Sequence, residues 1–384
     1  MAGAFGLAVT SQINFLVPLR ARELGATMEL VGLMVGAGAA APALFSVTSG
    51  VAIDRLGARQ TFVLGAAATA ALALLCVFVT NYWWFLALQP VLGVARNLGW
   101  LASQAYITGL GTEQQRPALA GRFAFFTNAG QMVAPAMIGI VAQLTGFRWA
   151  FLFLAAYSVI FAIVGLLMPS GVKRDAVATG HSGFGYKSAV QLLARPAMQV
   201  VLLLSGARLW IMWIFTAFLP IYLIEHGLAA GVVGIVMATS GVVATLITPT
   251  TGFWTRFLNP PSVAVIGLGC GVAGLLVAPH VPAIPLVYLV PALVGIGHGL
   301  SLPILIAAVA QAAPPDRRGV AFGLRATVNQ TAAAGGPVVV GLLIAASGML
   351  LGFTIGALIG GGMLAGAAFL HRAAQRAQPT TPET

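Results

Sequence analysis

Long apolar segments separated by short polar links run along almost the whole chain. Each segment is close to the ~20 residues that an α-helix needs to cross a bilayer. The pattern therefore predicts an all-α integral membrane protein with twelve transmembrane helices. Their approximate cores are 2–19, 31–52, 61–80, 84–107, 120–143, 149–168, 198–223, 229–252, 262–279, 285–312, 320–345 and 349–370.

The longest polar stretch, Pro169 to Pro196, divides these segments into six and six. Its second part, Tyr186–Leu193, is predicted to form a short surface helix before the seventh span. The predicted domains are an N-terminal six-helix bundle at 1–168, a cytoplasmic linker at 169–196, a C-terminal six-helix bundle at 197–371 and a cytoplasmic tail at 372–384.

The two halves repeat at a constant offset of 202 positions, the difference between Gly50 and Gly252. The same offset relates further pairs: Pro18 and Pro220, Glu23 and Glu225, Gly25 and Gly227, Gly93 and Gly295, Arg116 and Arg318, and Pro135 and Pro337. We therefore predict two pseudo-symmetric bundles.

The repeat also predicts where the first helix begins. The seventh span begins near Met198, and subtracting 202 from this position gives a start about four residues before Met1. We expect the chain to start slightly inside its first helix.

The composition excludes a soluble protein. The chain is 59% hydrophobic and 7% charged, whereas soluble domains carry about 25% charged residues.

The distribution of basic residues predicts the orientation in the membrane. With the N-terminus inside, fourteen Lys and Arg residues fall on the cytoplasmic side and three (Arg20, Arg22 and Arg148) outside. The positive-inside rule thus places both termini in the cytoplasm, and we expect the inner (plasma) membrane. The net charge of +11 reflects these loops, and nucleic-acid binding is not expected.

The link between the second and third segments carries a recognisable motif. It reads Gly50-Val-Ala-Ile-Asp54-Arg55-Leu-Gly57-Ala-Arg59 and resembles the signature loop of the major facilitator superfamily, G-x-x-x-D-R-x-G-x-R. Gly50 would allow close helix approach, Gly57 an unusual backbone conformation, and the arginines would hold the turn inside. The resemblance implies a transporter in which Asp54 engages the start of the eleventh helix, near 318–322, when the cytoplasmic side is closed. The alternative is a loop that only sets topology.

The fifth segment carries a second motif. Gly121, Gly130, Ala134, Pro135, Ile138 and Gly139 follow a spacing that resembles the antiporter motif of facilitator-type exporters, here with Ala134 and Ile138 in place of glycines. The eleventh segment has a degenerate copy that includes Gly336 and Pro337. A glycine–proline bend and a small-residue face would permit sliding contact during gating. The alternative is ordinary helix packing, and related importers carry part of the pattern.

Three basic residues lie near the middle of predicted spans, and none of the eight acidic residues does. The three are Arg96, Arg208 and His298, and such residues are functional candidates because burying them is costly. His298 is the repeat mate of Arg96, since 298 − 202 = 96. Either His298 titrates as a proton carrier, or the cations form a cavity that binds an anion. For Arg96 we also consider bonding to the backbone carbonyls of a bent neighbouring helix.

Further candidates for substrate binding are polar or aromatic residues in the spans. Trp100 and Gln104 share a helix face with Arg96. The other candidates are Gln12, Asn14, Asn128 and Gln330. Hydrogen bonding between helices explains these side chains about as well.

We therefore predict a secondary transporter that alternates access by rocking its halves, and export of small amphipathic or anionic molecules is favoured. The alternatives are proton-coupled uptake of an organic anion such as a carboxylate and, from another class, a non-transporting receptor or scaffold. The expected partners are a small-molecule substrate, a coupling proton and the bilayer, with the protein as a monomer. We expect no enzymatic activity, cofactor or metal site, because no phosphate loop, metal-ligand cluster or nucleophile elbow is present.

Overall fold

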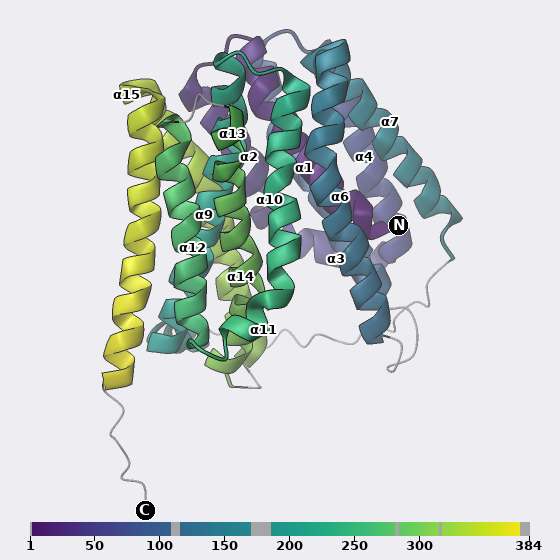
Figure 1. Ribbon diagram of the computed structural model, residues 1–384. Coiled ribbons are helices and arrows are strands. Elements are labelled where there is room, and N and C mark those ends of the chain that lie inside the picture. The colour runs from purple at the N-terminus through teal and green to yellow at the C-terminus, as the bar shows by residue number, and fades with distance from the viewer. Residues whose placement is uncertain (1, 109–115, 170–185, 281–283, 315–316, 377–384) are drawn as a thin grey trace, which may run out of the picture.

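The computed structural model of the chain describes residues 2–108, 116–169, 186–280, 284–314 and 317–376 (Figure 1). These residues are almost entirely helical, and no strand occurs among them. The first half contains α1 (Ala2–Glu23), α2 (Met28–Leu44), α3 (Ser46–Leu56), α4 (Ala58–Phe78), α5 (Tyr82–Thr108), α6 (Arg116–Thr145) and α7 (Phe147–Leu167).

The second half follows the short helix α8 (Tyr186–Leu193), whose bounds confirm the predicted surface helix. It consists of α9 (Pro196–Glu225), α10 (Ala230–Ile247), η1 (Thr248–Thr250), α11 (Thr251–Trp254), α12 (Pro260–Val277), η2 (Ala278–His280), α13 (Ile284–Val287), α14 (Leu289–Ala312) and α15 (Arg318–Arg376).

Breaks inside the apolar segments explain why there are more elements than spans. The second span bends at Phe45, three residues after Pro42, to give α2 and α3, because proline removes a helix hydrogen bond. In contrast, α15 holds two spans that meet at Gly348, where φ is 85°. Grouped in this way, the described helices form the twelve predicted spans. By length and composition alone, seven described helices could each cross a membrane, or eight with the bent pair.

The repeat is visible in the backbone. Gly25 and Gly227 have φ of 84° and 87°, and Gly146 and Gly348 have φ of 86° and 85°. Each pair differs by 202 positions, and all four connect one span to the next. A positive φ favours glycine, which has no Cβ to clash. We call the end of the bundle that holds these four turns the outer end, because the positive-inside prediction places it outside.

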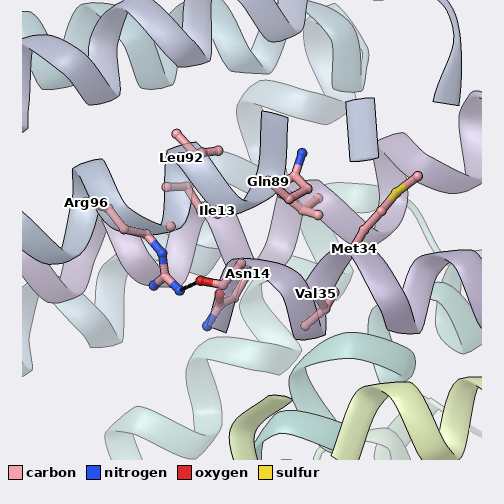
Figure 2. Close-up of a pocket in the computed structure, with 10 residues that line it drawn as sticks. Ile13, Asn14, Met34, Val35, Gln89, Leu92 and Arg96 are labelled. Atoms are coloured by element: carbon pink, nitrogen blue, oxygen red, sulfur yellow. Dashed lines mark hydrogen bonds between the residues drawn. The ribbon is translucent and has the colours of Figure 1, made fainter. Parts of the chain in front are cut away.

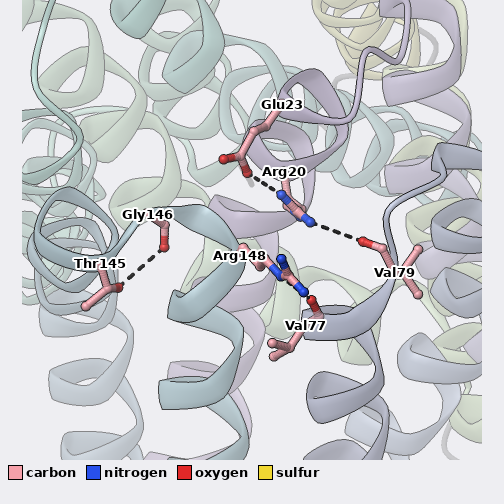
Figure 3. A network of polar contacts seen from close by, with 7 residues as sticks. All are labelled: Arg20, Glu23, Val77, Val79, Thr145, Gly146 and Arg148. Atoms are coloured by element: carbon pink, nitrogen blue, oxygen red, sulfur yellow. Dashed lines mark hydrogen bonds and ion pairs between the residues drawn. The ribbon is translucent and has the colours of Figure 1, made fainter.

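Arginines stabilise the outer end of α4 (Figure 3). Arg20 donates to the carbonyl of Val79 at 3.1 Å and Arg148 to that of Val77 at 2.7 Å. The last carbonyls of a helix lack partners within it and attract positive charge. Arg20 also forms an ion pair with Glu23 at 2.6 Å. These contacts join the ends of α1, α4 and α7.

The opposite, inner end is shaped by the motif at 50–59. Gly57 has φ of 86° and joins α3 to α4, so it adopts the conformation expected of it. Arg59 donates to the carbonyl oxygens of Gly165, at 3.1 Å, and Leu166 at the end of α7. In the second half the equivalent of Gly57 is Asn259, which instead caps α12 by accepting from the Ser262 amide at 3.0 Å. The two inner turns are therefore built differently.

Candidate functional site

The two halves meet most closely at two symmetry-related glycine contacts toward the outer end. Gly139 on α6 packs against Gly234 on α10, and Gly341 on α15 packs against Gly32 on α2. The offset of 202 converts the first pair into the second, since 139 + 202 = 341 and 32 + 202 = 234. The structure thus shows a pseudo-two-fold contact made by both motif-bearing helices.

Backbone atoms, rather than side chains, form these contacts. A Cβ added to Gly234 would clash with the carbonyl oxygen of Pro135, and one added to Gly32 would clash with that of Pro337. Small residues allow membrane helices to approach to this distance. The gating roles expected for Gly130, Pro135, Gly336 and Pro337 remain predictions, but both prolines lie within the contact between the halves.

Polar contacts close the same end. Arg22 at the end of α1 forms an ion pair of 2.7 Å with Glu225 at the end of α9. The Gln143 side chain on α6 accepts a hydrogen bond of 3.0 Å from the Gly231 amide on α10. The outer end therefore has both apolar and polar contacts between the halves.

At the inner end, the acidic residue of the motif is free of such contacts. Asp54 is exposed, and no hydrogen bond or ion pair joins it to any residue that the structure describes. Gly50 has no atom within 4 Å of the place a Cβ would occupy, so the close helix approach expected there does not occur in this conformation. The roles of Gly50, Asp54, Arg55 and Arg59 in gating remain predictions.

A pocket near the middle of the first half contains Arg96 (Figure 2). It is lined by α1, α2 and α5, with Asn14 and Gln89 as further polar residues. Arg96 is 8% exposed and donates to the Gly38 carbonyl on α2 at 3.3 Å. Its Nε is buried and no described residue forms a hydrogen bond with it. The guanidinium is thus held by a backbone carbonyl, while one donor remains unused.

Arg96 also reaches the other half of the molecule. Its guanidinium carbon lies 6.0 Å from the ring centre of Trp213 on α9, a distance at which cations and aromatic faces attract. Gln330 on α15 donates to the Ala39 carbonyl on α2 at 3.4 Å, which is a second polar contact between the halves near this level. Arg96 is therefore a basic group at the junction of both halves.

The remaining candidates are distributed over several environments. Trp100 stacks on Phe123 at 5.8 Å, and Gln104 is half-buried. Gln12 is fully buried, and both polar atoms of its amide group lack hydrogen-bond partners among the described residues. The side chain of Asn128 lies outside the described part of the structure. Trp100, Gln104 and Gln12 do not line the Arg96 pocket, whereas Asn14 does.

Arg208 and His298 form a separate pair inside the second half. Nη2 of Arg208 lies 2.6 Å from Nε2 and 3.0 Å from Nδ1 of His298. A guanidinium can only donate, so the histidine must accept and is neutral in this arrangement. The pair lines a pocket between α9, α12 and α14. The three central basic residues therefore belong to two pockets.

A further basic residue, Arg325, lies near the start of the eleventh span. It is in α15, seven residues after the helix begins at Arg318, and within the segment predicted at 320–345. At 1.5 Å per residue, it is about 10 Å along the helix. It is half-buried and donates to the Ser205 hydroxyl on α9 at 3.1 Å. Hydropathy placed Arg325 in a span, but its contact with Ser205 depends on how α15 packs on α9, which hydropathy does not encode.

Comparison with known families decides the identity of the fold. The sequence matches the profile of the Major Facilitator Superfamily at residues 1–337 and, in a second alignment, at 203–383. The chain belongs to the Major Facilitator Superfamily. As a member of this superfamily, it is a multi-pass membrane transporter and not an enzyme. The predicted fold class and family resemblance are thus confirmed.

Solved structures share the facilitator fold at low sequence identity. The nucleoside transporter NupG aligns with a TM-score of 0.77 and 16% identity over 98% of both chains. A bacterial homologue of the human lysosomal transporter Spinster, inward-facing and occupied, gives 0.77 and 16% over 100% of this chain and 97% of that one. A POT family transporter in complex with 5-aminolevulinic acid gives 0.73 and 13% over 98% and 95%. The comparison with curated proteins gives no match. These likenesses show the fold alone.

Proposed function

We propose that this facilitator exports small amphipathic or anionic organic molecules by rocking its two halves, residues 1–168 and 197–371, about a central site. We further propose that it acts as a monomer in the inner membrane with both termini in the cytoplasm. The spacing in the fifth segment, which resembles that of exporters, favours export over uptake. The proposed substrate class is defined by negative charge, because the central basic residue Arg96 is buried.

The observation that carries this proposal is the position of Arg96. It is buried, it lies at the junction of α5 with Trp213 of the other half, and its Nε–H is unpaired. No acidic residue of the sequence lies near the middle of a span to neutralise it. A substrate carboxylate or similar group would supply the missing charge and hydrogen bond. Trp213 and the apolar wall of the pocket would contact the rest of the molecule.

The uneven contacts between the halves support the proposed alternating access. The outer end has two glycine contacts and the Arg22–Glu225 ion pair, while Asp54 at the inner end is exposed. This is the arrangement expected when a central site is open to the inside. Rocking would separate the glycine pairs and bring Asp54 toward the start of α15, as the family motif implies.

The proposal is tested by following a fluorescent organic anion, such as carboxyfluorescein, in whole cells that express the protein. We expect expression to lower the intracellular signal and Arg96→Gln to abolish at least about 90% of this effect, because a buried charge-assisted contact is lost. An organic cation such as ethidium is the matched control and should be exported less. Equal export of both dyes, or full activity of Arg96→Gln, would contradict the anion assignment.

Uptake of an organic anion with a proton is the second candidate, and the same assay separates it from export. A transporter-dependent rise in the intracellular anion at acidic external pH would support uptake. The absence of a carboxylate from the middle of the spans disfavours it, since carboxylates are frequent proton carriers in membrane proteins.

A further inference from the structure

A second pocket, within the second half alone, contains basic groups without an acidic partner. Arg208 from α9 and His298 from α14 line it, and all its other lining residues are apolar residues or glycines of α9, α12 and α14. Arg208 is 7% exposed. Its Nε is buried and has no hydrogen-bond partner among the residues that the structure describes. The pocket thus contains a buried guanidinium with an unused donor.

The surrounding helices increase the positive charge. Arg325 on α15 donates to Ser205, which lies one helical turn before Arg208. In α9, α12, α14 and α15 the only acidic residue is Glu225, which is paired with Arg22. Glu225 is 17 residues from Arg208 along α9, or about 25 Å at the rise of a helix. No carboxylate of these helices therefore neutralises Arg208.

His298 does not supply the missing negative charge. Both of its ring nitrogens lie close to Nη2 of Arg208, at 2.6 Å and 3.0 Å, and a neutral imidazole carries no charge. The site consequently contains a guanidinium with an unused donor in a region where uncompensated charge is unfavourable.

The size of the pocket restricts its occupant. It has room for about one water-sized group, as does the Arg96 pocket in this conformation. The Arg208 pocket, however, lies within one half, so rocking of the halves would not widen it for an organic substrate. We propose that this pocket binds a single small inorganic anion, chloride in the simplest case, and that the anion stabilises the second half by neutralising Arg208. Chloride is only slightly larger than water and accepts hydrogen bonds from several directions. This site is distinct from the Arg96 site and does not depend on the proposed export.

The test uses the full chain purified in detergent, with sodium gluconate replaced stepwise by sodium chloride at a constant ionic strength of about 150 mM. Thermal unfolding is followed by tryptophan fluorescence, and binding by the line width of the ³⁵Cl NMR signal. We expect chloride to raise the Tm in a saturable manner by about 3 °C. Arg208→Gln should lose this response and the NMR broadening. The matched controls Arg96→Gln and Arg372→Gln, which remove a guanidinium elsewhere, should retain both.

A second variant keeps the test decisive even if Arg208→Gln does not fold. His298→Glu places a carboxylate at the position that now contacts Nη2 of Arg208. This tethered anion should replace chloride, so the variant in gluconate should be at least as stable as the wild-type protein in chloride. Its Tm should then be insensitive to chloride.

Three results would overturn the assignment. The first is an absent or non-saturating chloride effect on the wild-type protein, which would leave only a general salt effect. The second is an undiminished response in Arg208→Gln. The third is a His298→Glu variant that still gains stability from chloride. None of these measurements involves transport, so failure of this proposal would be separable from failure of the export hypothesis.

Discussion

Gly139 on α6 lies so close to Gly234 on α10 that a Cβ added to Gly139 would be 2.9 Å from the Gly234 Cα. The two glycines belong to different halves, and their contact requires the absence of both side chains. Such a contact lets the backbones of α6 and α10 pack closely at the outer end without polar side chains between them. The contact must also separate whenever the outer end opens.

We predict that Gly139→Val shifts the protein toward an outer-open state. The added methyl groups would clash with the α10 backbone, and overpacking of this kind costs about 1–3 kcal/mol. Double electron–electron resonance between spin labels at Thr145 on α6 and Val232 on α10 would measure the change. We expect a longer distance to become populated in the variant. The labelled protein should lack its native cysteines, Cys76 and Cys270.

Gly335→Val is the matched control, because no atom lies within 4 Å of the place its Cβ would occupy. It should leave the distance distribution unchanged. If Gly139→Val and Gly335→Val gave the same distribution, the glycine contact would not govern closure.

The repeat predicts an equivalent result for Gly341→Val on α15. A Cβ at this position would be 2.7 Å from the Met28 carbonyl oxygen and 3.1 Å from the Gly32 Cα. We expect labels on the outer ends of α2 and α15 to separate, with a shift similar to that of Gly139→Val. A normal distance in Gly341→Val would show that only one of the two contacts controls the gate.

Much of the fold could be predicted from hydropathy and the repeat. The segment expected at 84–107 is α5, Tyr82–Thr108, and the surface helix at Tyr186–Leu193 has the predicted bounds. Long apolar runs limit helix position strongly, because a membrane helix must satisfy all its backbone groups internally. The break at Phe45 was not predicted, because the sequence does not distinguish Pro42, which precedes a break, from Pro90, which lies inside the unbroken α5.

The contacts of the site could not be predicted in the same way. An offset of 202 relates equivalent residues, such as Gly139 and Gly341, but it does not say which residues touch. Arg208 and His298 were both expected near mid-span, yet their contact depends on how α9 packs on α14, which hydropathy does not encode. Arg96 was expected either to bind a ligand or to bond a backbone carbonyl. The structure shows the carbonyl bond to Gly38 together with an unpaired donor.

Asp54→Asn is predicted to slow transport without destabilising this conformation. Asp54 is exposed here, so replacing it removes no contact among described residues, and surface changes of this kind usually alter stability by less than about 0.5 kcal/mol. The inner-closed state would lose the interaction with the start of α15 that the family motif implies. We expect an unchanged Tm and a lower rate of dye export. Full export activity would contradict the latch.

The Arg22–Glu225 ion pair should influence the balance of states more than global stability. Both side chains are about 40% exposed, and exposed pairs contribute roughly 0–1 kcal/mol. Arg22→Glu would place two carboxylates together across the halves and favour separation at the outer end. The exchange Arg22→Glu with Glu225→Arg should restore the wild-type distance between spin labels at Thr145 and Val232. An uncorrected distance in the double variant would indicate that the pair is not a gate contact.

Arg20 should contribute more to stability than its neighbour Arg22, because Arg20 is only 5% exposed. It donates to the Val79 carbonyl and pairs with Glu23, so Arg20→Gln leaves a helix end and a carboxylate without their cation. Hydrogen bonds to charged groups contribute about 1.5–3 kcal/mol. We expect a loss of this size in thermal unfolding for Arg20→Gln and less than about 1 kcal/mol for Arg22→Gln. Equal losses in the two variants would mean that burial of Arg20 at the end of α4 does not stabilise the outer end.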